Sequence, residues 1–181
     1  MGAFSNRQGG CGVKKAAGFT LTELLIVVSL IAILATIAVP GFGSLTRANQ
    51  VSSASSELLN LLNYARSEAL TRGVSTKVTA PSVSSWTGAL QITTVGSTLL
   101  GDVETLRSFS NTGLGAAGVN SSASAAEVVF RPNGTVAAAF SVKLCARNDR
   151  ATTGKLVTVS QGGQASLTDF TPASASSSGC S

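Results

Sequence analysis

The stretch that decides the fold is KKAAGFTLTELLIVVSLIAILATIAV, residues 14–39. Its apolar part, from Phe19 to Val39, spans 21 residues, and an α-helix needs about 20 residues to cross the hydrocarbon core of a bilayer. The only ionisable side chain in this part is Glu23. The stretch therefore predicts a transmembrane helix that carries one buried acid near its start.

Glu23 needs a cationic partner at membrane depth. An acidic side chain near the bilayer centre costs about 2.5 to 3.5 kcal/mol on insertion scales. If the chain is cut between Gly18 and Phe19, the new amino group lies four residues before Glu23, one helical turn away on the same face. The amine of a neighbouring subunit would serve as well, and the positive end of the helix dipole also favours an acid at this position.

The charges before the apolar run predict its orientation. Lys14 and Lys15 flank the N-terminal end and hold it on the cytoplasmic side, so we expect a single pass through the membrane and a head that faces the periplasm or the exterior. An ordinary secretory signal, cleaved near Ala38, has an apolar core of only about 7 to 15 residues. A plain signal anchor tolerates the long helix but gives no reason for Glu23.

This stretch resembles the prepilin signal of type IV pilins and type II secretion pseudopilins. The matching residues are Gly18, Phe19, Glu23, the apolar helix and Pro40. The resemblance implies that a prepilin peptidase cleaves after Gly18, removing residues 1–18, and methylates Phe19. It also implies that Glu23 and Pro40 serve filament assembly, and that the helix over 19–39 packs in the filament core.

The rest of the chain has the size and composition of one secreted domain. Of 181 residues, those beyond Pro40 suffice for one domain and not two. Aromatic residues make up 5% and charged residues 12%, which favours a β-rich head over a helical enzyme core. The leader holds three of the 13 bases (Arg7, Lys14, Lys15) and none of the eight acids, so the mature chain has a net charge of +2, weak ground for nucleic-acid binding.

A second helical pattern follows Pro40, which we expect to kink the helix rather than end it. Apolar residues recur at three- and four-residue steps, with polar residues between them. This pattern predicts an amphipathic helix over residues 44–72, and the head segment that contains it spans residues 40–72. Gly73, directly after Arg72, is a residue at which helices commonly end. The apolar positions are Val51, Ala54, Leu58, Leu61, Leu62, Ala65 and Ala69.

Residues 73–181 predict the β-rich part of the head. The pair Asn133-Gly134 predicts a tight hairpin between residues 127–131 and 135–144. Residues 111–126, rich in Gly, Ala, Ser and Asn, predict a loop. We expect an α+β fold in which one antiparallel sheet, or two small packed sheets, lies against the second half of the long helix. Alternating patterns predict the other strands over 74–80, 89–95, 105–109, 155–160 and 164–168.

Two of the three cysteines predict a disulfide. Cys11 lies in the leader and would be lost with it. Cys145 and Cys180 remain as an even pair in a segment that the topology places outside the cytoplasm, where disulfides persist. A bridge between them would hold the C-terminal tail, residues 171–181, on the head. Two unpaired thiols are the alternative.

The sequence offers no catalytic, cofactor or metal site. The chain contains no histidine, which excludes histidine-based catalysis and histidine-containing metal sites. Its acids are scattered: Asp102 and Glu104 lie two residues apart, as a solvated face often has them, and no other acid of the head beyond Gly73 has an acidic neighbour in sequence. No glycine-rich phosphate-binding loop or activated nucleophile occurs either, so we expect a protein that is not an enzyme.

Four basic residues gather in sequence around Cys145, namely Lys143, Arg147, Arg150 and Lys155. Clustered cations can bind the phosphates of DNA, although the solvated edges of a hairpin also carry such residues.

A second resemblance covers most of the chain from Phe19. The runs YARSEA at 64–69, VFRPNG at 129–134 and FSVKLC at 140–145 resemble the H-type pseudopilin and FimT/FimU minor pilin group. The resemblance implies the type IV pilin fold. Some members of this group bind DNA through a Gly-Arg-x-Arg stretch, and the corresponding place here reads GQAS at 163–166, with neither arginine.

The resemblance also implies a function. We expect a minor pilin of a type IV pilus that takes part in priming assembly at the tip, in contact with other minor pilins and the major pilin. The alternatives are an H-type pseudopilin of a type II secretion system and a DNA-binding minor pilin for natural transformation.

Overall fold

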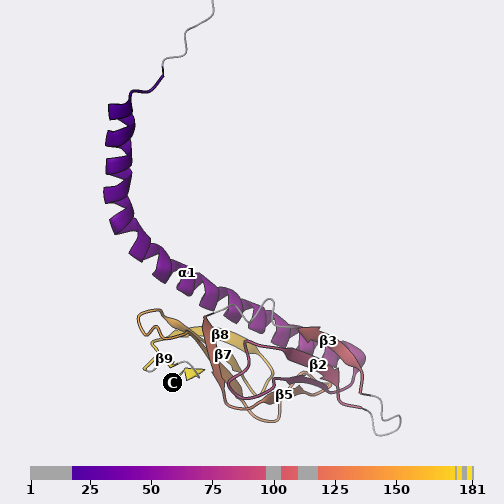
Figure 1. The fold of residues 1–181 in the computed structure, drawn as a ribbon. Coiled ribbons are helices and arrows are strands. Elements are labelled where there is room, and N and C mark those ends of the chain that lie inside the picture. Colours follow the sequence, from indigo (N-terminus) through magenta and orange to yellow (C-terminus); the bar gives the residue numbers. More distant parts are fainter. Residues whose placement is uncertain (1–17, 97–102, 110–117, 174, 177–178, 181) are drawn as a thin grey trace, which may run out of the picture. The chain divides into compact units, whose positions relative to one another are not determined.

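The structure, a computed structural model, describes residues 18–96, 103–109, 118–173, 175–176 and 179–180. The predicted leader, apart from Gly18, lies outside the described residues. The chain divides between Pro40 and Gly41 into two compact units. One helix, α1 (Leu21–Arg72), is followed by strands (Figure 1). The strands are β1 (Thr76–Thr79), β2 (Leu90–Thr94), β3 (Thr105–Phe109), β4 (Val119–Ala123), β5 (Glu127–Phe130), β6 (Phe140–Ala146), β7 (Gly154–Val159), β8 (Ala165–Phe170), β9 (Ala175–Ser176) and β10 (Gly179–Cys180).

Both ends of α1 have the residues that such ends require. The Thr20 hydroxyl oxygen accepts a hydrogen bond from the backbone N–H of Glu23 (3.2 Å), which satisfies one of the free donors of the first turn. The helix continues past Pro40. It ends at Gly73, whose φ of 66° suits a residue without a side chain and whose N–H donates to the carbonyl of Ala69 (3.1 Å). The predicted stop is confirmed.

In the first unit, α1 exposes apolar side chains on all sides. The sequence predicts a membrane-crossing helix over 19–39. Within the part of the chain that the structure describes, no helix has both the length and the apolarity that a membrane span requires. The exposed large apolar residues of this unit are Phe19, Leu21, Leu24, Leu25, Ile26, Val27, Val28, Leu30, Ile31, Ile33 and Leu34.

In the second unit, α1 is amphipathic as the spacing predicts. All seven predicted apolar positions, from Val51 to Ala69, are buried. Six of the outward positions carry short uncharged side chains: Asn49, Ser53, Ser56, Asn60, Asn63 and Ser67 are exposed. The buried stripe belongs to one apolar cluster that also contains Val78, Ile92 and Phe130, from one sheet, and Val142, Leu144 and Val157, from another.

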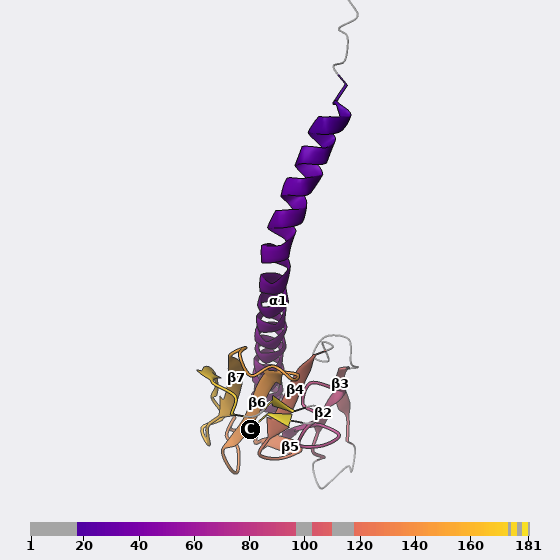
Figure 2. The same ribbon diagram turned by 60° about the vertical axis from the view of Figure 1, so that its left-hand side comes forward.

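The described strands form two four-stranded antiparallel sheets and one two-stranded sheet. The first sheet has the order β3-β2-β1-β5, and the second has the order β4-β6-β7-β8. Figure 2 shows β6 between β4 and β7. The antiparallel head against the second half of α1 is therefore confirmed, in its two-sheet form. The predicted loop over 111–126 is wrong in part, because β4 occupies Val119–Ala123; residues 111–117 lie outside the described residues.

The predicted hairpin between 127–131 and 135–144 is also wrong. The turn itself forms: Gly134 has a φ of 75° and its N–H donates to the carbonyl of Arg131 (2.8 Å). The two arms separate after the bridge between Phe130 and Val136. β5 pairs with β1 in the first sheet, and β6 pairs with β4 and β7 in the second. The turn therefore begins a crossing between sheets.

Arg66 of α1 fastens this turn to the turn between β7 and β8. Its guanidinium donates to the carbonyl oxygens of Gly134 (3.1 Å) and Gly162 (3.0 Å). Gly163 makes the approach possible, because a Cβ at this position would overlap the Gly134 carbonyl oxygen, and its φ of 75° also favours glycine. The helix and the two turns therefore meet at one contact, in which Gly134 supplies a carbonyl oxygen and Gly163 leaves room for it.

We predict that Gly163→Ala lowers the free energy of unfolding of the head by about 3 kcal/mol or more, because the new methyl group meets a backbone carbonyl in a strained conformation. Gly162→Ala is the matched control, since its Cβ would come no nearer than 3.8 Å to the Ser160 hydroxyl. Urea unfolding of both variants measures the difference. Equal stability of the two would contradict this account of the contact.

Candidate functional site

Three of the predicted processing and assembly residues, Gly18, Phe19 and Glu23, are exposed. Gly18 has no atom within 4 Å of the place where a Cβ would lie, and the side chain of Phe19 is 84% exposed. Glu23 lies in the first turn of α1. The backbone at the junction is therefore accessible. Glu23 lies four residues after Phe19, the residue that cleavage would make the N-terminus, and α1 begins between them at Leu21.

Among the described residues of its own unit, the apolar run that follows has nothing packed against it. Helices with apolar residues on all sides occur where lipid or other helices surround them, and a contiguous exposed apolar surface of this extent marks an interaction site. Each such side chain gains about 1.5 to 3 kcal/mol when it is fully removed from water. Association or membrane burial is therefore what this segment is suited for chemically.

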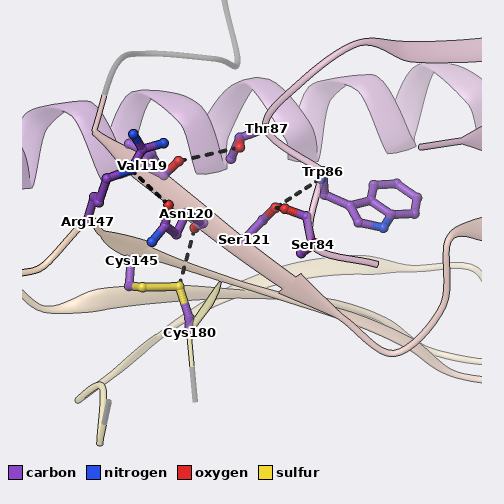
Figure 3. The surroundings of a disulfide bond; sticks show 9 residues. All are labelled: Ser84, Trp86, Thr87, Val119, Asn120, Ser121, Cys145, Arg147 and Cys180. Carbon is purple, nitrogen blue, oxygen red and sulfur yellow. Dashed lines mark hydrogen bonds between the residues drawn. A yellow bond between two sulfur atoms is a disulfide. The ribbon is translucent and has the colours of Figure 1, made fainter. Parts of the chain in front are cut away.

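A disulfide joins Cys145 of β6 to Cys180 of β10, with an S–S distance of 2.01 Å and Cα atoms 5.9 Å apart. Both cysteines are buried. The bridge closes the segment that follows β8 onto β6 (Figure 3). The predicted pair is thus joined in the structure, and the tail is attached to the second sheet.

β4 connects the disulfide region to the loop that precedes β2. Asn120 lies opposite Cys145 in the register of β4 and β6, and its carbonyl oxygen is 3.3 Å from the Cys180 sulfur. That sulfur carries no proton in a disulfide, so this is a contact and not a hydrogen bond. The neighbouring Ser121 hydroxyl accepts from the N–H of Trp86 and donates to the carbonyl of Ser84, both at 2.9 Å (Figure 3).

The structure divides the four predicted DNA-binding cations. Opposite residues of antiparallel strands share a face. Lys155 lies opposite the buried Leu144, and Lys143 lies opposite Leu156, so the two lysines project from opposite faces of the sheet. Lys155 forms an ion pair with Asp169. The ammonium of Lys143 is 5.7 Å from the centre of the Phe170 ring.

Arg147 and Arg150 are the two members that stay together, on the loop between β6 and β7. The guanidinium of Arg147 donates to the side-chain oxygen of Asn120 (3.2 Å), and the backbone N–H of Arg147 donates to the carbonyl of Gly118 (2.6 Å). Both arginines are exposed. The four cations therefore do not form one continuous surface.

Asp149 fastens the same loop to α1. Its carboxylate accepts hydrogen bonds from the Thr152 hydroxyl (2.8 Å), the Ala151 N–H (2.9 Å) and the Arg47 guanidinium (2.6 Å). These bonds, that from the Thr152 hydroxyl first, hold the pKa of Asp149 below its ordinary value.

Sequence reasoning missed the partners of the scattered acids. Asp149 pairs with Arg47, Asp169 with Lys155, and Glu127 with Lys77 (3.5 Å). Glu104 and Glu68 both pair with Arg72; Asp102 lies outside the described residues. Only the i,i+4 spacing of Glu68 and Arg72 was visible in the sequence, because the other pairs depend on strand register or on loop packing.

The described residues contain no group of three or more His, Cys, Asp or Glu side chains that could hold a metal ion. Ion pairs occupy the acids named above.

Family models match two parts of the chain. Residues 13–39 match the prokaryotic N-terminal methylation motif, and residues 54–163 match the model described as type II transport protein GspH. The second match covers more than half of the chain. The chain belongs to the GspH family. No curated protein sequence matches this GspH-family protein.

Solved structures of similar fold include a type IV minor pilin and a minor pseudopilin of a type II secretion system. The type IV minor pilin FimU of Pseudomonas aeruginosa PAO1 is 26% identical, with a TM-score of 0.56 over 68% of this chain and 92% of that chain. The minor pseudopilin EpsH of the Vibrio cholerae type II secretion system is 16% identical, with a TM-score of 0.52 over 66% and 96%, and shows the fold alone. This GspH-family protein is thus a minor pilin or pseudopilin.

We predict that the Cys145→Ser, Cys180→Ser double variant loses roughly 4 kcal/mol of unfolding free energy, because the bridge closes a loop with a sequence separation of 35 residues. Urea unfolding of the oxidised wild type and the variant measures the change. Reduced wild-type protein is the matched control and should resemble the variant. A loss below about 1 kcal/mol would contradict the idea that the disulfide stabilises the head by lowering the entropy of the unfolded chain.

We predict that Asp149→Asn lowers stability by about 1 kcal/mol at pH 7. Because folding lowers the pKa of Asp149, its contribution is present above the unfolded pKa of about 3.9 and is lost as the pH falls through the folded pKa. Unfolding at several pH values should therefore show the wild type and the variant converging in acid. Asp169→Asn, whose carboxylate side chain is 62% exposed, is the control and should change less.

Proposed function

We propose that this GspH-family protein is a minor pilin of a type IV pilus and takes part in priming pilus assembly at the tip. The observation that carries the proposal is the helix from Leu21 onward, which leaves its large apolar side chains uncovered directly after an accessible Gly18-Phe19 junction. A segment of this kind is suited to lipid before assembly and to neighbouring helices afterwards.

The proposal gives each part of the chain a role. Prepilin peptidase removes residues 1–18 by cleaving after Gly18, and Phe19 becomes the methylated N-terminus. Residues 19–39 form the inner-membrane and filament-core helix, and residues 40–72 and 73–181 form the periplasmic head. The match of residues 13–39 to the methylation motif supports this division.

In this proposal, Glu23 draws a subunit into the filament by electrostatic attraction. Its carboxylate lies in the first helical turn, where the helix dipole favours negative charge. The new amino group of Phe19, or that of a neighbouring subunit, neutralises it in a setting of low dielectric, where such attraction is stronger than in water. Pro40, at the boundary between the two units, serves assembly by shaping the helix. The partners are other minor pilins and the major pilin.

An H-type pseudopilin of a type II secretion system is the second candidate. The family model, described as a type II transport protein, favours it, whereas the higher identity to FimU than to EpsH favours the pilus. Under either candidate the protein is a structural subunit and not an enzyme. We do not extend the proposal to DNA binding, because Lys143 and Lys155 project from opposite faces of their sheet.

We predict that Glu23→Ala reduces incorporation of this protein into surface filaments at least tenfold, because the terminal amine loses its carboxylate partner in a setting of low dielectric. Immunoblots of sheared filaments measure incorporation, and electron microscopy counts the pili. Glu57→Ala, which removes an acid from the second unit of the same helix, is the matched control and should leave both unchanged.

The same strains separate the alternatives. Mass spectrometry should show that the Glu23→Ala chain still begins at Phe19, so that the defect lies in assembly and not in cleavage. Lost piliation with normal protein secretion supports the pilus, and lost secretion with normal piliation supports the pseudopilus. Normal incorporation of the variant, or a mature chain that begins elsewhere, would overturn the assembly role.

A further inference from the structure

A cationic shoulder lies at the start of the head. We use this name for Phe42, Leu45 and Arg47 of α1 together with Arg147 and Arg150 of the β6–β7 loop. The ion pair between Arg47 and Asp149 (2.6 Å) holds the helix and the loop together. The shoulder therefore combines two apolar and three basic side chains from segments that are far apart in sequence.

The apolar members are exposed where the head itself offers no cover. The side chains of Phe42 and Leu45 are 67% and 57% exposed, and they lie three residues apart, on one side of the helix. Beside them, a groove of about 400 Å³ separates the helix from the loop. Leu45 and Ala48 line one wall of the groove, and Ala151 and Thr153 line the other.

The basic members give this surface a positive charge. Asp149 is the one acid of the β6–β7 loop, residues 147–153, and its carboxylate is occupied by Arg47, Thr152 and the loop backbone. Arg147 bonds the neutral amide of Asn120. Within the described residues, no acidic partner is found for Arg147 or Arg150. Three arginines against one carboxylate leave the shoulder cationic.

The distance along the helix from the apolar run to the shoulder is short. Leu45 and Arg47 follow Val39 by six and eight residues within the continuous helix α1, which amounts to at most about 9 and 12 Å of rise. The headgroup layer extends about 5 to 8 Å beyond the hydrocarbon on each side of a bilayer. If residues 19–39 span the membrane, as the proposed function requires, chain connectivity alone keeps Leu45 and Arg47 within reach of the headgroups, whatever the angle between the two units.

We infer that the cationic shoulder binds the phosphate groups of anionic phospholipids, so that the unassembled subunit rests its head on the membrane surface. Phe42 and Leu45 enter the interfacial layer, where aromatic and apolar side chains are favoured. Arg47, Arg147 and Arg150 meet lipid phosphates, to which a guanidinium binds in bidentate geometry. The inference rests on the membrane insertion in the proposed function.

The first test uses the head alone, residues 41–181, which contains both four-stranded sheets, the disulfide and every residue of the buried apolar cluster. We expect this fragment to sediment with vesicles that contain phosphatidylglycerol, to bind phosphatidylcholine vesicles far more weakly, and to be released by salt. Arg147→Gln with Arg150→Gln should weaken binding about 25-fold, or about fivefold for each cation.

A matched control removes the same charge elsewhere. Lys77→Gln with Arg131→Gln takes two cations from the first sheet and the turn that follows it, and binding should stay unchanged. Equal losses in the two double variants would overturn the inference, because attraction would then depend on net charge alone. Arg150→Gln by itself breaks no contact that is recorded among the described residues, so its fivefold loss excludes misfolding as the cause.

A titration with duplex DNA at the same salt concentration tells whether the cationic shoulder binds lipid or nucleic acid. Binding to DNA that is tighter than to anionic vesicles, and is lost with Arg147 and Arg150, would overturn the lipid assignment. No binding to vesicles would overturn it too. Because the fragment lacks residues 19–40, a negative result leaves the proposed assembly role standing.

A second measurement uses the full mature chain in nanodiscs. Amide hydrogen exchange of residues 147–153 should be slower in discs that contain phosphatidylglycerol than in discs of phosphatidylcholine. Exchange of residues 132–134, in the turn that follows β5, should be the same in both. Equal exchange of the 147–153 loop in the two lipids would overturn the inference.

Discussion

The packing of one face of α1 against both sheets is the interaction on which the head depends. The stripe from Val51 to Ala69 lies in the same apolar cluster as the inward residues of the first and the second sheet. Each fully buried leucine, such as Leu58 or Leu62, contributes about 1.5 to 3 kcal/mol by leaving water. The helix therefore contributes to a core that the two sheets share.

The same helix has an opposite requirement before Pro40. There its large apolar side chains remain exposed among the described residues, and burying them would need lipid or other helices. In the second unit, by contrast, the chain itself provides the core that covers the helix. This division explains how a minor pilin or pseudopilin can have a stable head and still require assembly.

The head is closed by contacts between segments that are distant in sequence. Arg66 holds two turns, Asp149 holds a loop to the helix, and the disulfide holds the tail to β6. Each contact uses few residues and allows little variation, as Gly163 illustrates by having no room for a side chain. The helix contributes one buried stripe to the apolar cluster, and these contacts fix the arrangement of the loops around it.

The sequence predicted features wrongly, or not at all, where the outcome depends on contacts between segments that are distant in the chain. Asn133-Gly134 predicted a turn correctly, because that conformation depends on the two residues themselves. It could not predict that the arms would enter different sheets. The pairing of Glu127, Asp149 and Asp169 was invisible for the same reason, since strand register and loop packing bring their cationic partners to them. β4 was missed because its residues, Val119–Ala123, are small and polar and lack a clear alternating pattern.

The sequence by itself determined the long helix, its amphipathic second half, its stop at Gly73, most strands, the α+β class and the cysteine pair. The helix, its stop and the strands follow from periodicity and from single-residue conformational preferences, which act over a few residues. The cysteine pair follows from the oxidising compartment that the sequence predicts. The tertiary structure alone decided the two-sheet topology, the partners of the acids, the separation of Lys143 from Lys155 and the gathering of Arg47, Arg147 and Arg150 at one shoulder. Those features depend on which segments meet after the chain has buried its apolar surface, and no short stretch of sequence encodes that outcome.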